Sequence, residues 1–124
     1  MSPASKNASS RVASGFQSEA LARHHLESQG YRILCANYRF RRGEIDLIAL
    51  DQQTLCFIEV RSRTHSLCSP IETIGVAKQK SIARAAQHFL VHAWPHPLPV
   101  CRFDVVSVVH PGPIFTLVRD AFSV

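Results

Sequence analysis

The chain has 124 residues, of which 46% are hydrophobic and 19% are charged. A chain of this length buries a sizeable core as one domain, which excludes general disorder, a fibrous repeat and a disulfide-stapled miniprotein. Fourteen Lys and Arg against nine Asp and Glu give a net charge of +5, a balance that favours polyanionic partners.

The first half of the chain predicts one helix and three strands. Residues 1–10 are rich in Ser, Ala and Asn and predict a flexible tail, so that 11–124 form the single domain. The predicted elements are a helix at Arg11–Gln29 that ends at Gly30, strands at Tyr31–Asn37, Glu44–Leu50 and Thr54–Arg61, and a basic turn at 38–43.

The second half predicts one helix and two strands. A polar loop at 62–69 leads to a helix at Ile71–Ala93, and the prolines that follow exclude further helix. The last strands are expected at Cys101–Val109 and Ile114–Val118. This order of elements predicts an α/β domain whose central mixed sheet is flanked by helices.

Charged residues interrupt the apolar faces of both helices. The stripe of the second helix consists of Ile82, Ala85, Ala86, Phe89 and Ala93. One turn earlier the stripe reaches Lys78, which we expect to point at the sheet, whereas Lys80 falls on the opposite side. In the first helix Glu19 and Arg23 share the apolar side, which leaves two interpretations open: a surface ion pair between them, or a functional carboxylate at Glu19.

Two further carboxylates stand in the middle of apolar strands. Asp46 lies within GEIDLI and Glu59 within FIEVRSR, although Asp and Glu are seldom buried unless they are paired. A hairpin closed at Gln52-Gln53 sets Asp46 directly opposite Glu59, with Glu44 opposite Arg61. The sequence therefore predicts that the two carboxylates point to the same side of the sheet.

This opposition requires compensation by a shared proton, a basic side chain or a divalent cation, because two carboxylates ~4 Å apart repel by about 1 kcal/mol in water and about 4 kcal/mol at a shielded site. One interpretation is an internal ion-pair ladder in which Arg61 serves both acids. The other is a Mg²⁺ or Mn²⁺ site whose ligands are Asp46, Glu59 and the carbonyl of Val60. Such an ion promotes phosphodiester hydrolysis.

Basic residues surround the predicted hairpin, where a phosphate backbone would approach. The residues that we expect to contact nucleic acid are Arg39, Arg41, Arg42, Arg63 and Lys80.

Several short motifs resemble one bacterial family. They are Gly15 with Glu19 and Ala20, Gly30-Tyr31, Asn37-Tyr38-Arg39, GEIDLI from Gly43, FIEVRSR from Phe57 and RFDVV from Arg102. Over residues 11–110 the chain resembles the YraN-like uncharacterised family. The resemblance implies a restriction-endonuclease-like core of order αβββαβ, similar to that of archaeal Holliday-junction resolvases. In nucleases of that fold a D…E-x-K motif binds metal; Asp46 and Glu59 match its carboxylates, and Glu19 matches the acidic residue of the first helix.

One position departs from this pattern, because Arg61 stands where the family usually has Lys. Arginine does not lose its proton in proteins, so it orients phosphate or water, and Lys78 can supply a movable ammonium instead. We therefore predict a Mg²⁺- or Mn²⁺-dependent endonuclease for structured or branched DNA rather than RNA. Its expected catalytic residues are Glu19, Asp46, Glu59, Arg61 and Lys78.

Other functions stay open. The first alternative is a nuclease-fold nucleic-acid-binding protein with weak or lost catalysis, and the second is a scaffold subunit that binds no nucleic acid. A homodimer that acts on symmetric junctions is also open.

Weaker signals complete the pattern. The spacing of His88, His92 and His96 is that of a metal stripe, but solvated helix-end histidines are the favoured interpretation. Asp104 is expected to pair with Arg102. Trp94 and Phe40 are candidates for stacking on bases, although Trp94 is rather expected to cover the core.

The four cysteines, Cys35, Cys56, Cys68 and Cys101, show no CxxC spacing, and three of them lie in apolar runs. We expect free thiols that pack as small hydrophobic groups in a reducing compartment. The sequence has no apolar leader and no apolar run of about 18 residues, so we expect a cytoplasmic protein that does not enter a membrane.

Overall fold

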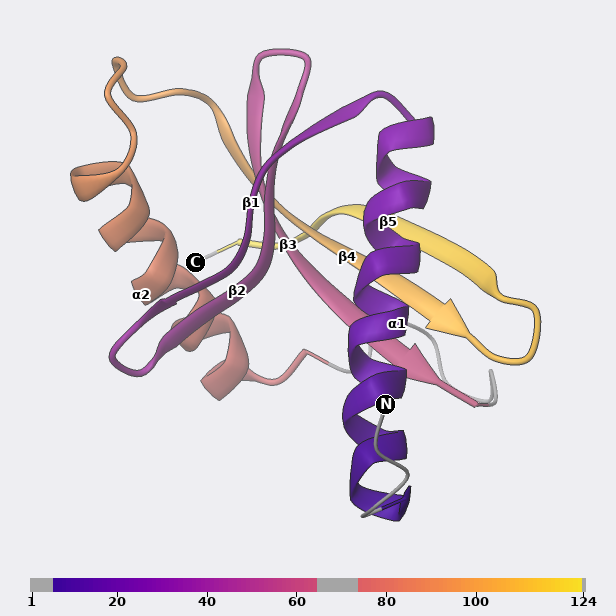
Figure 1. The fold of residues 1–124 in the computed structure, drawn as a ribbon. Helices are drawn as coiled ribbons and strands as arrows, with labels where there is room; N and C mark the ends of the chain where they lie inside the picture. The colour runs from indigo at the N-terminus through magenta and orange to yellow at the C-terminus, as the bar shows by residue number, and fades with distance from the viewer. Residues whose placement is uncertain (1–5, 65–73, 124) are drawn as a thin grey trace.

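A computed structural model of the chain describes residues 6–64 and 74–123. The elements are α1 (Lys6–Ser28), β1 (Tyr31–Phe40), β2 (Gly43–Asp51), β3 (Thr54–Arg63), α2 (Val76–His92), β4 (Cys101–Val109) and β5 (Ile114–Phe122) (Figure 1). Their order matches the αβββαβ order of a restriction-endonuclease-like core, with β5 added at the end.

The five strands form one mixed sheet in the order β1-β2-β3-β4-β5. Only β3 and β4 are parallel, and the other neighbours are antiparallel. A parallel pair needs a long crossover, which here contains α2. The predicted mixed sheet is therefore confirmed.

The helices cover opposite faces of this sheet (Figure 1). Alternate residues of β2 and β3 serve the two faces: Leu47 and Ile58 pack with α1, whereas Ile48 and Phe57 pack with α2. The predicted stripe of α2 is confirmed for its four buried members, Ile82, Ala85, Ala86 and Phe89. Its fifth member was placed wrongly, because Ala93 is the exposed cap residue that follows the helix.

Several predicted boundaries shift. α1 begins at Lys6 instead of residue 11. β1 continues to Phe40, so most of the expected basic turn is strand, because residues 38–40 pair with β2. α2 begins at Val76, and β5 continues to Phe122. The prediction of a tail is wrong for residues 6–10, which are helical. Residues 1–5 of that tail lie outside the described residues, as do residues 65–73, which include most of the polar loop and the expected start of the second helix.

The predicted hairpin register is confirmed from Asp51–Thr54 to Leu47–Ile58, where the ladder between β2 and β3 ends. Beyond this point β2 stays paired with β1, and β3 stays paired with β4. The prediction that Glu44 lies opposite Arg61 is therefore wrong. Glu44 lies opposite Arg39 of β1, and its Oε2 atom is 3.4 Å from Nε of Arg39. The two strands separate at the level of Asp46 and Glu59.

A buried polar network is centred on Asp104 in the first half of β4. The fully buried Asp104 accepts hydrogen bonds from Arg102 Nε at 2.8 Å, the Tyr31 hydroxyl at 3.0 Å and the Asp120 N–H at 2.9 Å. Arg102 also reaches Asp51 at 2.9 Å. The predicted pair of Asp104 and Arg102 is confirmed.

Three of the four cysteines lie in the described part of the chain, and all three are free thiols. Cys56 is buried as expected, Cys35 is half-buried, and Cys101 is exposed, since it begins β4 rather than filling the core. Cys68 lies outside the described residues. Within the described ranges, no helix combines the length and the apolar character needed to cross a bilayer.

Candidate active site

Asp46 bridges the gap that opens where β2 and β3 separate. Its Oδ2 atom accepts a hydrogen bond from the backbone N–H of Val60 at 2.8 Å. The side chain thus replaces the backbone partner that β2 no longer offers to β3. Because the N–H and C=O of one strand residue face the same neighbour, the Val60 carbonyl is also turned toward Asp46.

Glu59 lies beside this contact with its side chain only 9% exposed. One carboxylate oxygen, Oε2, is 3.7 Å from the Nζ atom of Lys78 on α2. The other, Oε1, is buried and has no hydrogen-bond partner among the described residues. Buried polar atoms are normally satisfied, so this oxygen marks a place where a ligand belongs.

The electrostatics of Glu59 are unfavourable for its charged form. Burial, and next the negative charge of Asp46, raise the pKa of Glu59 well above its usual range, and a hydrogen bond between the two carboxyl groups, which requires a proton on one of them, raises it further. The charges of Lys78 and Arg61 offset this only in part. The two carboxylates, including the unpartnered Oε1 atom of Glu59, supply the oxygen ligands that a hard cation such as Mg²⁺ prefers.

The residues present therefore fit a divalent metal ion. No group of three His, Cys, Asp or Glu side chains that could hold a metal occurs in the described part of the chain. Mg²⁺ does not require one, because it keeps several waters and is usually bound through one or two carboxylates. Asp46, Glu59 and the Val60 carbonyl would suffice.

Glu19 reaches the same region from α1. Its Oε1 atom accepts a hydrogen bond from Nδ2 of Asn37 at 2.8 Å. Burial raises the pKa of Glu19, the Asn37 hydrogen bond lowers it, and the charge of Asp46 raises it again. The surface pair of Glu19 with Arg23 was a wrong interpretation, because Arg23 pairs with Glu27 at 3.9 Å.

Asn37 is a site residue to which the sequence interpretation gave no role. It lies within β1 with a positive φ of 55°, a conformation that Asn tolerates better than most residues. The predicted strand ended at Asn37, where Asn is common, so the only available signal was its place in the Asn37-Tyr38-Arg39 motif.

The remaining predicted cations fall into two groups. Lys78 contacts Glu59 as described. Burial, and next the charge of Arg63, lower the pKa of Arg61, and the nearby charge of Glu59 offsets this in part. The others lie at the periphery. Arg39 pairs with Glu44, whereas Arg41, Arg42 and Lys80 are exposed. The Nε atom of Arg63 is buried without a hydrogen-bond partner within the described ranges.

The predicted histidine stripe is not uniformly solvated. His88 packs under the end of β1: its ring stacks on Phe40 with centroids 3.6 Å apart, and its Nδ1 atom lies 2.6 Å from the Tyr38 hydroxyl. Trp94 donates to the Pro97 carbonyl and packs on the core of the α2 face, as expected.

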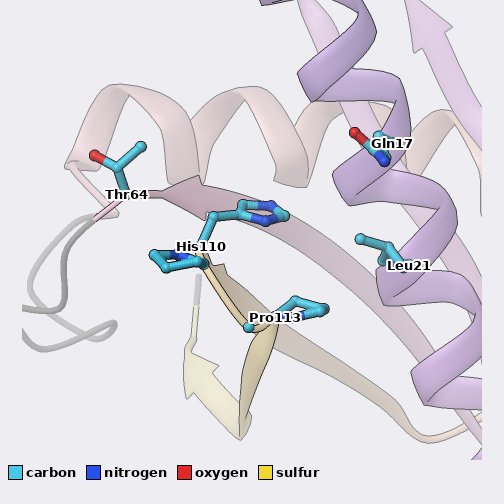
Figure 2. Close-up of a pocket in the computed structure, with 7 residues that line it drawn as sticks. Gln17, Leu21, Thr64, His110 and Pro113 are labelled. Atoms are coloured by element: carbon cyan, nitrogen blue, oxygen red, sulfur yellow. The ribbon is translucent and has the colours of Figure 1, made fainter.

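A cavity of about 630 Å³ lies between α1 and the turn after β4 (Figure 2). Its lining consists of Gln17, Leu21, Thr64, His110, Pro111, Gly112 and Pro113. The ring of His110 is fixed by the Ser18 hydroxyl, 3.0 Å from Nε2. Because no carboxylate lines this cavity, it is separate from the site at Asp46 and Glu59.

The raised pKa predicts how stability depends on pH. Because the pKa of Glu59 is higher in the folded chain, the free energy of unfolding falls as the pH rises above about 4.5, the ordinary value for Glu. The neutral amide of Glu59→Gln avoids this loss. We expect the metal-free variant to be more stable than the parent by about 1–2 kcal/mol at about pH 9, with little difference near pH 4.

Urea denaturation in EDTA across this pH range measures the difference. The control is Glu27→Gln, which alters a half-exposed surface pair and should change stability by a few tenths of a kcal/mol at most pH values. A stability difference for Glu59→Gln that does not grow with pH would contradict the assigned electrostatics.

Comparison with known proteins gives one consistent result. The family model described as "Uncharacterised protein family UPF0102" matches residues 18–108. A similar protein named UPF0102 protein occurs in Chlorobium chlorochromatii, with 48% identity over 89% of this chain and 91% of the relative. A second one in Chlorobium phaeobacteroides is 52% identical over 77% of this chain and 75% of the relative. A third in Stutzerimonas stutzeri is 44% identical over 89% of this chain and 94% of the relative. The matched residues include Glu19, Asp46, Glu59 and Lys78.

Proposed function

The chain belongs to the uncharacterised protein family UPF0102, the YraN-like family that its motifs resemble, and we propose that it is a metal-dependent endonuclease acting on structured or branched DNA. One observation carries the proposal: Asp46 and Glu59 meet where two strands separate, and Glu59 keeps a buried oxygen without a partner. A divalent cation would compensate both the repulsion and the unpartnered atom.

Asp46, Glu59 and the Val60 carbonyl would hold the ion, which when bound polarises a phosphoryl oxygen and lowers the pKa of water. The hydrogen bond from Val60 fixes the Asp46 carboxylate against β3. Glu19, held by Asn37, is a positioning residue close enough to Asp46 that the charge of Asp46 raises the pKa of Glu19.

Lys78 and Arg61 serve the phosphate. Lys78 reaches Glu59 from α2 with its side chain 36% exposed, so its ammonium contacts both the site and an arriving ligand. Arg61 keeps its charge and orients a phosphate oxygen or the attacking water. The exposed arginines near the β1–β2 turn, together with Arg63 and Lys80, would hold the DNA backbone, for which the net charge of +5 is suited.

A cleavage assay tests the proposal. Purified protein is mixed with nicked, flapped, four-way and linear duplex DNA in Mn²⁺, in Mg²⁺ and in EDTA. We expect metal-dependent cleavage of the branched substrates and little of the linear duplex. If no DNA is cut with either metal, the proposal is wrong.

A second candidate is a nucleic-acid-binding protein that has lost catalysis, and it is favoured by Arg61 at a position where the family pattern has Lys. This candidate predicts salt-sensitive DNA binding without cleavage, and cleavage that appears in Arg61→Lys.

If the protein cleaves DNA, substitution of Lys78 tests its role in the reaction. If Lys78 supplies the ammonium, Lys78→Met should lower kcat by about tenfold to a hundredfold, the usual range for a positioned proton-transfer or charge-stabilising group, with KM changed less. Lys80→Met is the matched control on the exposed side of the same helix, and it should raise KM while kcat stays unchanged. Equal effects of both variants on kcat would remove Lys78 from the catalytic set.

A further inference from the structure

A second cavity, of about 560 Å³, opens on the α2 side of the sheet. It is lined by Phe40, Arg41 and Arg42 at the end of β1 and by Arg84 of α2. Three guanidinium groups thus share one pocket, and no carboxylate lines it.

The charges of this pocket are not compensated within the described residues. Arg39 and Arg102 have carboxylate partners, whereas Arg41, Arg42 and Arg84 make no ion pair in the part of the chain that the structure describes. Like charges held together in this way are stabilised when an anion enters between them.

The backbone of the pocket is fixed in place. The Ser81 hydroxyl on α2 donates to the Arg42 carbonyl at 2.9 Å. Gly43 lies so close to α2 that a Cβ atom there would be 2.7 Å from the Ala85 nitrogen. Both contacts hold the β1–β2 turn against the helix, so the pocket exists before a ligand arrives.

The chemistry of the pocket favours a phosphate over a base. One face of the Phe40 ring stacks on His88, and the guanidinium of Arg41 lies 5.3 Å from its centroid. The ring therefore already supports Arg41 and His88 and is not an unoccupied platform for a base. Guanidinium groups bind phosphate oxygens in bidentate geometry.

The position of the pocket relates it to the carboxylate site. Lys78 and Arg84 lie on the same helix, six residues apart, which is about 9 Å along the helix axis and about a third of a turn around it. Both places are therefore within reach of one DNA strand a few nucleotides long.

We propose that the pocket of Phe40, Arg41, Arg42 and Arg84 binds a backbone phosphate of the DNA strand that is cut, a few nucleotides from the cut. The assignment of the cut strand rests on the proposed nuclease function, whereas the phosphate pocket itself does not require cleavage.

Binding in EDTA tests the pocket without catalysis. The dissociation constant for branched DNA is measured against salt for the parent, Arg42→Gln/Arg84→Gln and the control Arg32→Gln, whose exposed arginine lies at the far end of β1. We expect binding of the double variant to be about tenfold weaker, with a salt slope reduced by about 0.9 for one lost phosphate contact. The control should match the parent, and an unchanged slope in the double variant would overturn the proposal.

Neutral methylphosphonates, placed singly along the strand, locate the phosphate. One substitution should weaken binding by the parent and have no effect on the double variant. If inorganic phosphate raises the melting temperature of the parent but not of the double variant, while both bind DNA equally, the pocket serves free phosphate and the strand assignment is wrong. A parent that binds in this way but does not cut refutes only the proposed nuclease function.

Discussion

Asp46→Asn is expected to lower metal-dependent DNA cleavage about a thousandfold, because a bound metal ion contributes several kcal/mol to the transition state and each 1.4 kcal/mol corresponds to about a factor of ten. The amide oxygen of Asn can still accept the hydrogen bond from Val60 that Asp46 accepts at 2.8 Å. The variant therefore keeps the local geometry and loses only the charge. Rates with saturating DNA in Mn²⁺ measure the effect.

Stability should change in the opposite direction. The negative charge of Asp46 is one cause of the raised pKa of Glu59, so the neutral amide relieves repulsion in the metal-free protein. We expect the melting temperature of Asp46→Asn in EDTA to equal or exceed that of the parent, and Mn²⁺ to raise it less than it raises that of the parent.

A matched control is Asp120→Asn, an exposed Asp with a φ of 53° that Asn also tolerates. It should keep full cleavage. Cleavage by Asp46→Asn at more than about a tenth of the parent rate would remove Asp46 from the metal site, and an equal loss in Asp120→Asn would indicate a general effect of charge.

The arrangement of the candidate site combines a predictable part with an unpredictable one. Strand periodicity and the turn at Gln52-Gln53, both of which are local, predict the register that the structure confirms as far as Leu47–Ile58. Asp46 and Glu59 lie one step beyond that ladder and interact through their side chains rather than as a directly opposed strand pair. The direction of Lys78 follows from helical periodicity, and its contact with Glu59 agrees with that expectation.

The sequence did not predict the point at which β2 leaves β3 and pairs only with β1. Extending the hairpin register places Glu44 opposite Arg61, but β2 has two neighbours, and beyond Leu47 it stays with β1. No local pattern indicates where a central strand leaves one partner. The hydrogen bond of Asn37 to Glu19 likewise joins residues 18 positions apart in a tertiary contact.

Asp104→Ala is expected to lower the free energy of unfolding by about 3 kcal/mol, the lower end of the range for breaking a buried ion pair by removing one partner. The fully buried carboxylate accepts hydrogen bonds from Arg102, the Tyr31 hydroxyl and the Asp120 N–H. Its removal leaves these donors without their acceptor. The loss stays at the lower end because Arg102 retains Asp51 at 2.9 Å. Urea denaturation at neutral pH measures it.

Asp51→Ala is the matched comparison, because it removes the other carboxylate of Arg102 from a position that is 22% exposed. Water replaces much of what is lost there, so the expected destabilisation is about 1 kcal/mol. Both variants should cleave DNA at the parent rate per folded molecule, since none of the hydrogen bonds of Asp104 among the described residues is made with Asp46 or Glu59. A loss of stability below about 1 kcal/mol for Asp104→Ala would mean that the network is not a buried anchor of β4, and a selective loss of cleavage would place Asp104 in the site instead.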